Sequence, residues 1–400
     1  MDRALNPFAP GAGNQPPELA GRDQIIEDAR IALTRVIRGR PDRGHLLLGL
    51  RGVGKTVLLN RIEEEAEALG FHVVSLEAPE DRPLAELLVP KLRGVALKLS
   101  RHERARDFGL RALGALRNFA AAFRISVAGV DIEVTPEPGL ADSGELEMDL
   151  PDLLLALGRA AQAAGSGVVL LIDEIQYLSS QDLGALIVAL HRVNQKGLPV
   201  LLFGAGLPQI ARLAGDAKSY TERLFRYPRV DKLDRLAAAE AIEKPLLSEG
   251  AAMEPEAVDQ IYARTEGYPY FLQEWGYHAW DEANASPITI HDVETASTDA
   301  MLRLDGDFFR VRFDRLTDRE KDYMRGMAQL GAGPHRSGDV AGVLKISVRS
   351  AAPLRDALIR KGMIYSEKHG MVAFTVPMFD DYLRRVMPTW TPPHPRSRSH

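Results

Sequence analysis

The chain of 400 residues contains no cysteine, which excludes disulfides, thiolate metal sites and cysteine nucleophiles. Its ten histidines show no H-x-x-x-H or comparable spacing, so we expect no zinc site. No apolar run approaches the length of a membrane helix, and we expect no membrane contact. Residues 1–18 lack a basic-then-apolar signal pattern and are rich in Pro, Gly and Asn. They are predicted to be a disordered leader of a cytoplasmic protein.

Acidic and basic residues are distributed unevenly. The formal net charge is −5, but residues 301–400 hold 18 Lys and Arg against 11 Asp and Glu, which leaves +7 there and −12 in residues 1–300. A basic C-terminal part on an acidic body indicates that double-stranded DNA, if bound, would meet the C-terminus. The alternative is a surface whose charge is uneven by chance. A chain of this length also predicts two or three domains.

One stretch, residues 45–60, carries the most specific pattern. Leu46 to Leu48 are typical of a short buried strand, and helical periodicity begins at Val57. The residues between them fit the phosphate-loop pattern G-x-x-x-x-G-K-[ST]. In this pattern backbone N–H groups and the start of a helix face a phosphate. The predicted nucleotide-binding residues are Gly49, Gly52, Gly54, Lys55, Thr56 and Val57.

The motif assigns roles to two side chains. Lys55 would reach the β- and γ-phosphates of ATP, and the Thr56 hydroxyl would bind Mg²⁺. A chance glycine turn is the alternative, but the strand before the loop and the helix after it favour the phosphate loop.

A second informative stretch spans residues 168–177. Its apolar run predicts a strand buried on both faces of a parallel sheet, and Asp173 and Glu174 end that strand. Ligands bind at this edge of open α/β sheets. Asp173 is predicted to hold Mg²⁺ and Glu174 to act as general base. The alternative is a surface turn that happens to end in two acids.

Residues 100–148 interrupt the alternation of strands and helices. The alternating pattern of residues 123–134 predicts a β-hairpin in this insertion. The insertion could contact a partner or DNA. Equally, it could be a family-specific addition without such a role. Residues 236–305 contain successive helical patterns and are expected to form a small helical lid.

Residues 306–388 show the layout of a winged helix-turn-helix domain. A capping box at Thr317 and Glu320 opens the first of three helices, and two short strands follow the third. The third helix of such a domain enters the major groove of DNA. The candidate DNA-binding residues are Arg349, Arg355 and Lys361 on that helix and Lys368 in the hairpin. Solvated surface charges are the alternative. Residues 389–400 are expected to be a disordered tail.

The segments GLRGVGKT, LLIDEIQ, ERLF and GYP, followed by a winged helix, resemble the border group between AAA+ and STAND ATPases that is called origin-recognition-like or archaeal-type. The resemblance spans residues 19–388. It implies an α/β fold with a P-loop parallel sheet flanked by helices over residues 19–235, a helical lid and a C-terminal winged helix-turn-helix. It also implies ATP and Mg²⁺ as cofactors and a homo-oligomer in the ATP state.

The same resemblance implies roles for residues outside the two motifs. Arg223 would be an arginine finger acting on a neighbouring subunit, with Arg226 as the second candidate. Origin-binding initiators carry a lid arginine where this chain has Gly267-Tyr268-Pro269, and in STAND ATPases a lid proline, here Pro269, reports the bound nucleotide. A polar sensor is also expected near Gly206; only Gln209 lies nearby, and we assign none.

Three functions follow from these patterns. The first is a slow, switch-like ATPase (ATP + H₂O to ADP + phosphate) that couples its nucleotide state to DNA binding through the C-terminal winged helix. The second is a STAND-like signalling or defence ATPase whose winged helix is an internal regulatory module without DNA binding. The third, a P-loop kinase, is disfavoured because neither a lid nor a wing would serve a small acceptor.

Overall fold

The computed structural model describes residues 1–11, 14, 16–79, 82–125, 139–366, 368 and 370–392. The predicted hairpin at residues 123–134 falls mostly outside this range, as does the tail from residue 393. Within the described ranges, no helix combines the length and the apolar character needed to cross a bilayer.

A five-stranded parallel sheet in the order β2-β3-β4-β1-β5 forms the centre of the N-terminal part. The inner strands β1, β3 and β4 are buried on both faces, as their uninterrupted apolar sequences predict. The edge strand β5 pairs with β1, and beyond it Arg229 forms an isolated bridge to Leu48. The strands are β1 (Gly44–Leu48), β2 (Phe71–Glu77), β3 (Gly167–Asp173), β4 (Val200–Gly206) and β5 (Phe225–Arg226).

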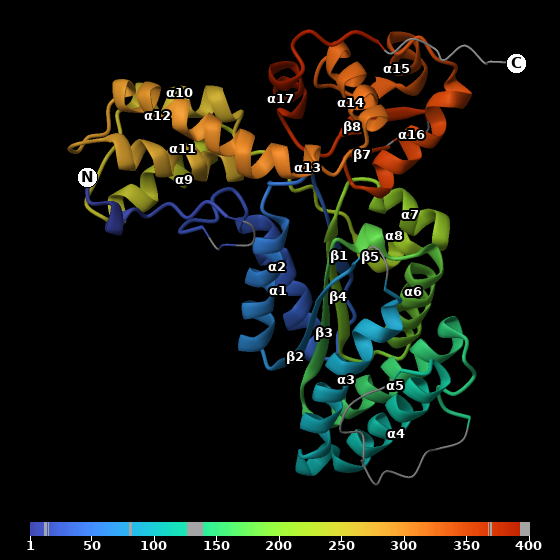
Figure 1. The fold of residues 1–400 in the computed structure, drawn as a ribbon. Coiled ribbons are helices and arrows are strands. Elements are labelled where there is room, and N and C mark those ends of the chain that lie inside the picture. The colour runs from blue at the N-terminus through green and yellow to red at the C-terminus, as the bar shows by residue number, and fades with distance from the viewer. Residues whose placement is uncertain are drawn as a thin grey trace, which may run out of the picture.

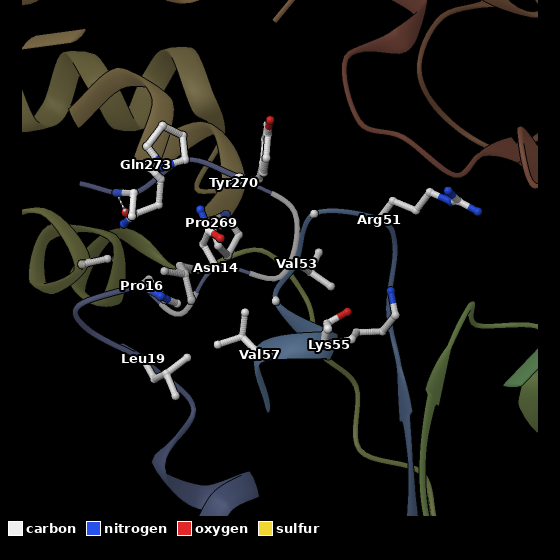
Figure 2. A pocket seen from close by; sticks show the side chains of 18 of the residues that line it. Asn14, Pro16, Leu19, Arg51, Val53, Lys55, Val57, Pro269, Tyr270 and Gln273 are labelled. Atoms are coloured by element: carbon white, nitrogen blue, oxygen red, sulfur yellow. Dashed lines mark hydrogen bonds between the residues drawn. The ribbon is translucent and has the colours of Figure 1, made fainter. Parts of the chain in front are cut away.

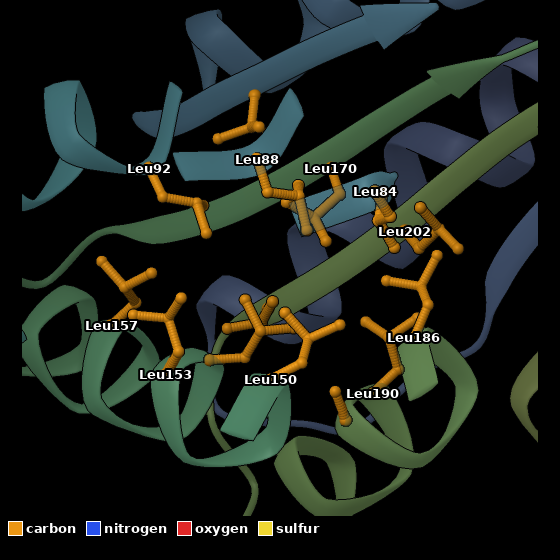
Figure 3. Packing of buried hydrophobic residues seen from close by; sticks show 14 of the residues in the cluster. Leu84, Leu88, Leu92, Leu150, Leu153, Leu157, Leu170, Leu186, Leu190 and Leu202 are labelled. Carbon is orange, nitrogen blue, oxygen red and sulfur yellow. The ribbon is translucent and has the colours of Figure 1, made fainter. Parts of the chain in front are cut away.

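Helices cover both faces of this sheet (Figure 1). One face packs against α1 and α2, which share a core with strands β1, β3 and β4. The other face packs against α3, α5 and α6, whose leucines meet Leu170 and Leu202 of the sheet (Figure 3). Helix α4 packs on α3 and α5. The helices of this part are α1 (Asp23–Ile37), α2 (Lys55–Ala68), α3 (Leu84–Ser100), α4 (Arg106–Ala122), α5 (Leu146–Ala164), α6 (Ser180–Gln195), α7 (Ile210–Ala217) and α8 (Thr221–Leu224).

The lid is helical, as expected, and lies at the same end of the sheet as the C-terminal domain (Figure 1). It consists of α9 (Arg235–Ser248), α10 (Pro255–Thr265), α11 (Pro269–Glu282) and α12 (Ile290–Arg303). A π-helical turn, Leu304–Arg310, and the short α13 (Val311–Phe313) continue from α12 into the C-terminal domain.

The C-terminal domain has the helix and strand order of a winged helix-turn-helix. The capping box of Thr317 and Glu320 opens its first helix as predicted. Two elements were not expected: the strand β6, which completes a sheet in the order β6-β8-β7, and the last helix α17. The elements are α14 (Asp318–Leu330), β6 (His335–Arg336), α15 (Ser337–Val343), α16 (Val348–Arg360), β7 (Ile364–Tyr365), β8 (Met371–Phe374) and α17 (Phe379–Val386).

The lid and the C-terminal domain share one hydrophobic core. An aromatic series connects them: Tyr270 of α11 stacks on Phe308 with ring centroids 4.6 Å apart. The next residue, Phe309, stacks on Tyr382 of α17 at 5.2 Å. Because the two parts have no separate cores, we expect them to move as one body.

The first eleven residues pack against the lid, whereas the sequence predicts a disordered leader over residues 1–18. Phe8 is buried against Gly276 of α11, with only 3% of its surface exposed. Asn6 donates to the carbonyl of Tyr277 and to the carboxylate of Asp281, both at 3.0 Å. A single buried aromatic ring and a few polar contacts thus hold residues whose composition alone indicates disorder.

Candidate functional site

The phosphate loop connects β1 to α2 at the carboxyl edge of the sheet. Gly52 and Gly54 have φ angles of 82° and 91°, which favour glycine, and Gly54 caps the start of α2. Gly49 lies against the carbonyl of Val230, where a Cβ atom would come within 2.2 Å of the oxygen. The loop therefore has the backbone conformation that its glycine pattern predicts.

Lys55 is 7% exposed and folds back on its own loop, where Nζ donates to the Leu50 carbonyl at 2.8 Å. Burial lowers the pKa of Lys55, while the carboxylates of Glu174 and Asp173 act in the opposite direction. The ammonium thus lies among the acids of β3 without forming an ion pair to any described carboxylate.

The predicted Mg²⁺ ligands are adjacent: Thr56 Oγ1 donates to Asp173 Oδ2 at 2.6 Å. Burial raises the pKa of Asp173, and the hydrogen bond from Thr56 opposes that shift. Hydroxyl and carboxylate oxygens are the hard donors that Mg²⁺ prefers, and Mg²⁺ commonly takes few protein ligands beside phosphates and water. This pair therefore fits the ion that the sequence predicts.

Glu174 follows β3 in a left-handed conformation with φ 50°. Its carboxylate accepts a hydrogen bond from Nε2 of Gln176, whose Oε1 accepts from the N–H of Leu207 at 3.1 Å. Gly206 makes room for this link, because a Cβ atom there would lie 2.0 Å from Oε1 of Gln176. Gln176 thus fixes the predicted base against the end of β4, where we assigned no sensor from the sequence; Gln209 is buried nearby.

A cavity of about 640 Å³ opens above the loop. Its walls come from the N-terminal segment, the phosphate loop, the end of β3, the lid and the turn that follows α12. In Figure 2, Asn14, Pro16 and Leu19 lie with Val57 and Pro269 on one side of the view, and Lys55 and Arg51 lie on the other. Besides these, the lining includes Gly52, Val53, Gly54, Thr56, Asp173, Glu174, Tyr270, Gln273, Phe308 and Arg312.

Three parts of the molecule hold the backbone of the phosphate loop. Within the sheet domain, Arg22 donates to the Val53 carbonyl at 3.2 Å. The Tyr270 N–H, at the start of lid helix α11, donates to the Gly52 carbonyl at 3.2 Å. The Arg51 N–H donates to the Thr375 carbonyl of the C-terminal domain at 3.0 Å. A change in the backbone conformation of the loop would therefore alter its hydrogen bonds to the lid and to the C-terminal domain.

The Arg51 side chain extends the contact with the C-terminal domain. Its guanidinium donates to the Tyr177 hydroxyl at 2.8 Å. Gly362, between α16 and β7, lies directly on both groups, since a Cβ atom there would be 2.4 Å from the Tyr177 hydroxyl and 2.8 Å from Arg51. Arg51 belongs to the phosphate loop and Tyr177 follows Glu174, so this turn rests on both nucleotide motifs.

The two arginine-finger candidates lie outside the cavity. Arg223 is exposed on α8 and does not line the cavity of its own chain. Arg226 is half-buried in β5 and pairs with Asp42 at 3.5 Å. Arg223 is therefore the better placed of the two to reach a second copy of the chain.

The four candidate DNA-binding residues differ in their surroundings. Arg349 and Lys368 are exposed, at the start of α16 and in the hairpin. Arg355 pairs with Asp356 at 2.9 Å. Lys361 binds the buried Glu320 carboxylate at 2.7 Å, so it supports the capping box of α14. Arg349 and Lys368 thus face solvent, whereas Arg355 and Lys361 form ion pairs within the domain.

Several site residues could not be assigned from the sequence. Gln176 stands two positions after Glu174 inside LLIDEIQ, and this spacing is the only signal that could have pointed to it. Arg312, Tyr270 and the N-terminal wall reach the cavity through tertiary packing, for which the chain carries no local motif.

Comparison with known families agrees with this geometry. Residues 18–203 match the family model described as the AAA ATPase domain. The match includes both nucleotide motifs and supports ATPase activity. We call the sheet and its flanking helices, which contain the matched residues, the AAA domain. Residues 306–383 match a second family, described as a domain of unknown function (DUF8462).

Several solved structures are similar to this chain, and one of them has a TM-score above 0.5. The Walker-type ATPase PABY2304 of Pyrococcus abyssi is 18% identical, with a TM-score of 0.57 over 95% of this chain and 99% of that one. The Orc1 protein of Aeropyrum pernix in complex with DNA is 15% identical, with a TM-score of 0.46 over 96% of each chain. Cdc6p from Pyrobaculum aerophilum is 13% identical, with a TM-score of 0.47 over 97% of this chain and 98% of that one. No curated protein sequence matches the chain.

Proposed function

We propose that the protein is an ATP-driven switch in which the nucleotide in the AAA domain controls the position of the C-terminal domain. The hydrogen bond from the Arg51 N–H to the Thr375 carbonyl carries this proposal, because it joins the phosphate loop to that domain without an intermediate. Phosphate binding rearranges the backbone amides of such a loop, so the bond is sensitive to the nucleotide.

In the proposed reaction, water attacks the γ-phosphorus of ATP, the bond to the ADP oxygen breaks, and the Glu174 carboxylate takes the proton of the water. Thr56 and Asp173 would hold Mg²⁺, which when bound neutralises phosphate charge. Lys55 would leave the Leu50 carbonyl for the β- and γ-phosphates. Gln176 keeps the Glu174 carboxylate in place for the water.

Two substitutions test the ATPase site. Lys55→Ala should abolish ATP binding, because the loop loses the cation that faces the phosphates. Glu174→Gln should retain binding but slow turnover by about 10²–10⁴-fold, the usual contribution of a positioned base. Lys196→Ala, at an exposed lysine, is the matched control. Normal turnover in Glu174→Gln would mean that another group is the base.

We further propose that duplex DNA binds the exposed side of the C-terminal domain. The net charge of +7 over residues 301–400 and the exposure of Arg349 and Lys368 support this partner. Arg349 stands at the start of α16, the helix that reads bases in domains of this layout.

Filter binding to duplex DNA at two salt concentrations tests this proposal. Arg349→Ala and Lys368→Ala should each weaken binding, and the loss of Lys368 should reduce the salt slope by about one unit. Arg40→Ala, an exposed arginine of the AAA domain, should bind as wild type does. Equal binding by the double variant at low salt would contradict a role for this surface.

A second candidate is a STAND-like signalling ATPase whose C-terminal domain is an internal restraint. The packing of Gly362 on Arg51 and Tyr177 favours it, because this contact uses the domain inside the molecule. This candidate predicts that the protein binds no DNA at either salt concentration although its ATPase site is normal. The same filter assay therefore distinguishes the two candidate functions.

A further inference from the structure

Arg312 lines the ATP cavity although it belongs neither to the AAA motifs nor to the lid. It follows the π-helical turn Leu304–Arg310 and lies in α13. Lys55, Arg51, Asp173 and Glu174 line the same cavity.

The guanidinium of Arg312 is held in place but has spare hydrogen-bonding capacity. It lies over the Phe308 ring, 4.1 Å from the centroid, and one terminal nitrogen donates to the Phe308 carbonyl. Its Nε is buried and has no hydrogen-bond partner among the described residues. No carboxylate of the described residues forms an ion pair with the Arg312 guanidinium. Burial lowers the pKa of Arg312 to about 10, with Arg51 acting in the same direction, so the group stays charged at neutral pH.

These observations indicate an anionic ligand. Arg51, Lys55 and Arg312 place three cations around one cavity, and no described carboxylate forms an ion pair with any of them. Lys55 is buried and the two arginines are half-buried. A cation withdrawn from water without an ion-pair partner is unfavourable unless a ligand supplies the opposite charge. Arg312 lines this cavity together with Asp173 and Glu174, the two acids at the end of β3 that the sequence assigns to Mg²⁺ and to the attacking water.

We propose that Arg312 binds the γ-phosphate of ATP within its own chain and thereby distinguishes ATP from ADP. The inference rests on the ATPase site described above. Arg312 is also placed to transmit the difference, because the neighbouring Phe308 and Phe309 connect the lid to α17. An arginine suits this task, since its planar group can donate to two phosphate oxygens while it stacks on an aromatic ring.

Equilibrium binding of fluorescent ATP and ADP analogues tests the proposal, with Glu174→Gln as the background so that ATP persists. Arg312→Ala should weaken ATP binding about 10- to 100-fold and ADP binding less than about 3-fold, as expected when one charged hydrogen-bonding group loses a phosphate. Arg312→Lys should recover part of the loss. Arg310→Ala is the matched control, because Arg310 is exposed two residues earlier and pairs with Asp314 at 3.5 Å.

Two results would overturn the proposal. An equal loss for ATP and ADP would assign Arg312 a structural role on Phe308, and unchanged binding of both would exclude it from the site. These outcomes differ from failure of the ATPase site itself, in which the parent protein would bind neither nucleotide and Lys55→Ala would change nothing. Thermal unfolding of each variant verifies that it is folded.

Discussion

Glu174 combines a strained backbone with a fixed side chain. A left-handed conformation costs a residue other than glycine on the order of 1–2 kcal/mol, and such strain concentrates at functional sites. Here it turns the carboxylate toward Gln176, which is itself anchored to the end of β4. We infer that the strain is retained because it orients the carboxylate that we propose as the base.

His45 shows how burial at a single residue makes the stability of the AAA domain depend on pH. It lies in β1 with 1% of its surface exposed, packs edge-on against Phe203 at 5.2 Å, and neither ring nitrogen has a hydrogen-bond partner in the described part of the chain. Burial lowers its pKa from 6.5 to about 4, and Arg226 acts in the same direction. Because the folded state resists the proton that the unfolded state accepts, the stabilisation is complete above pH 6.5 and is lost as the pH falls toward 4.

We therefore predict that His45→Leu flattens the pH dependence of unfolding. Between pH 7 and pH 5, the wild type should lose about 2 kcal/mol more unfolding free energy than the variant, from the linkage of the two pKa values. Urea denaturation followed by circular dichroism at both pH values measures this difference. Parallel losses in the two proteins would contradict the assignment to His45.

At the level of the elements, the lid and the C-terminal domain depend on one another. Phe309 is fully buried and contacts Phe271 of the lid as well as Phe379 and Tyr382 of α17. All three tryptophans also lie in this shared unit or on its last described segment, so their fluorescence reports on it and not on the AAA domain.

Phe309→Ala should destabilise the shared unit by about 3–5 kcal/mol, because it leaves a cavity between the two parts. Tryptophan fluorescence during urea unfolding measures this loss. Phe108→Ala is the control: Phe108 is 42% exposed on α4, and its removal should change stability by less than about 0.5 kcal/mol. An unchanged tryptophan transition in Phe309→Ala would mean that the two parts are stabilised independently.

A helix or strand could be predicted from the sequence where the residues that determine it are neighbours in the chain. The strands β1, β3 and β4 could be predicted because burial on both faces leaves an uninterrupted apolar run, and α14 because its capping box is contained in four residues. The two-residue strand β6 could not be predicted, since it exists only through its pairing with β8. The packing of Phe8 and Asn6 could not be predicted either, because it depends on Gly276 and Tyr277 of α11, far away in sequence.

In the candidate site, too, the residues of the two motifs could be predicted from the sequence, and those brought in by tertiary packing could not. Lys55, Thr56 and Asp173 meet because two motifs end at the same edge of a parallel sheet. Arg312 lies more than 250 residues after the phosphate loop in sequence. It reaches the cavity because the C-terminal domain packs on that loop. No spacing rule connects such residues, so only the structure places them.

At the scale of the whole molecule, the phosphate loop is where all three parts meet, and a fourth participant is expected from a second copy of the chain. Arg223 is exposed and outside its own cavity, which is the placement that an arginine finger acting on a neighbour requires. We predict that mixing Arg223→Ala with Lys55→Ala restores part of the ATPase activity that each lacks alone. Arg212→Ala, an exposed arginine of α7, should not lose activity. Absence of recovery, together with a monomer in ATP by light scattering, would exclude assembly through Arg223.

The central claim, that the nucleotide controls the position of the C-terminal domain, is tested most directly by a distance measurement. Because the chain has no cysteine, spin labels can be attached at Lys196→Cys in the AAA domain and Asp339→Cys in the C-terminal domain, both exposed. Pulsed electron resonance on the Glu174→Gln protein should give one distance distribution without nucleotide and a shifted one with ATP, and Lys55→Ala should prevent the shift. An identical distribution with ATP, with ADP and without nucleotide, in protein shown to bind both, would contradict the claim.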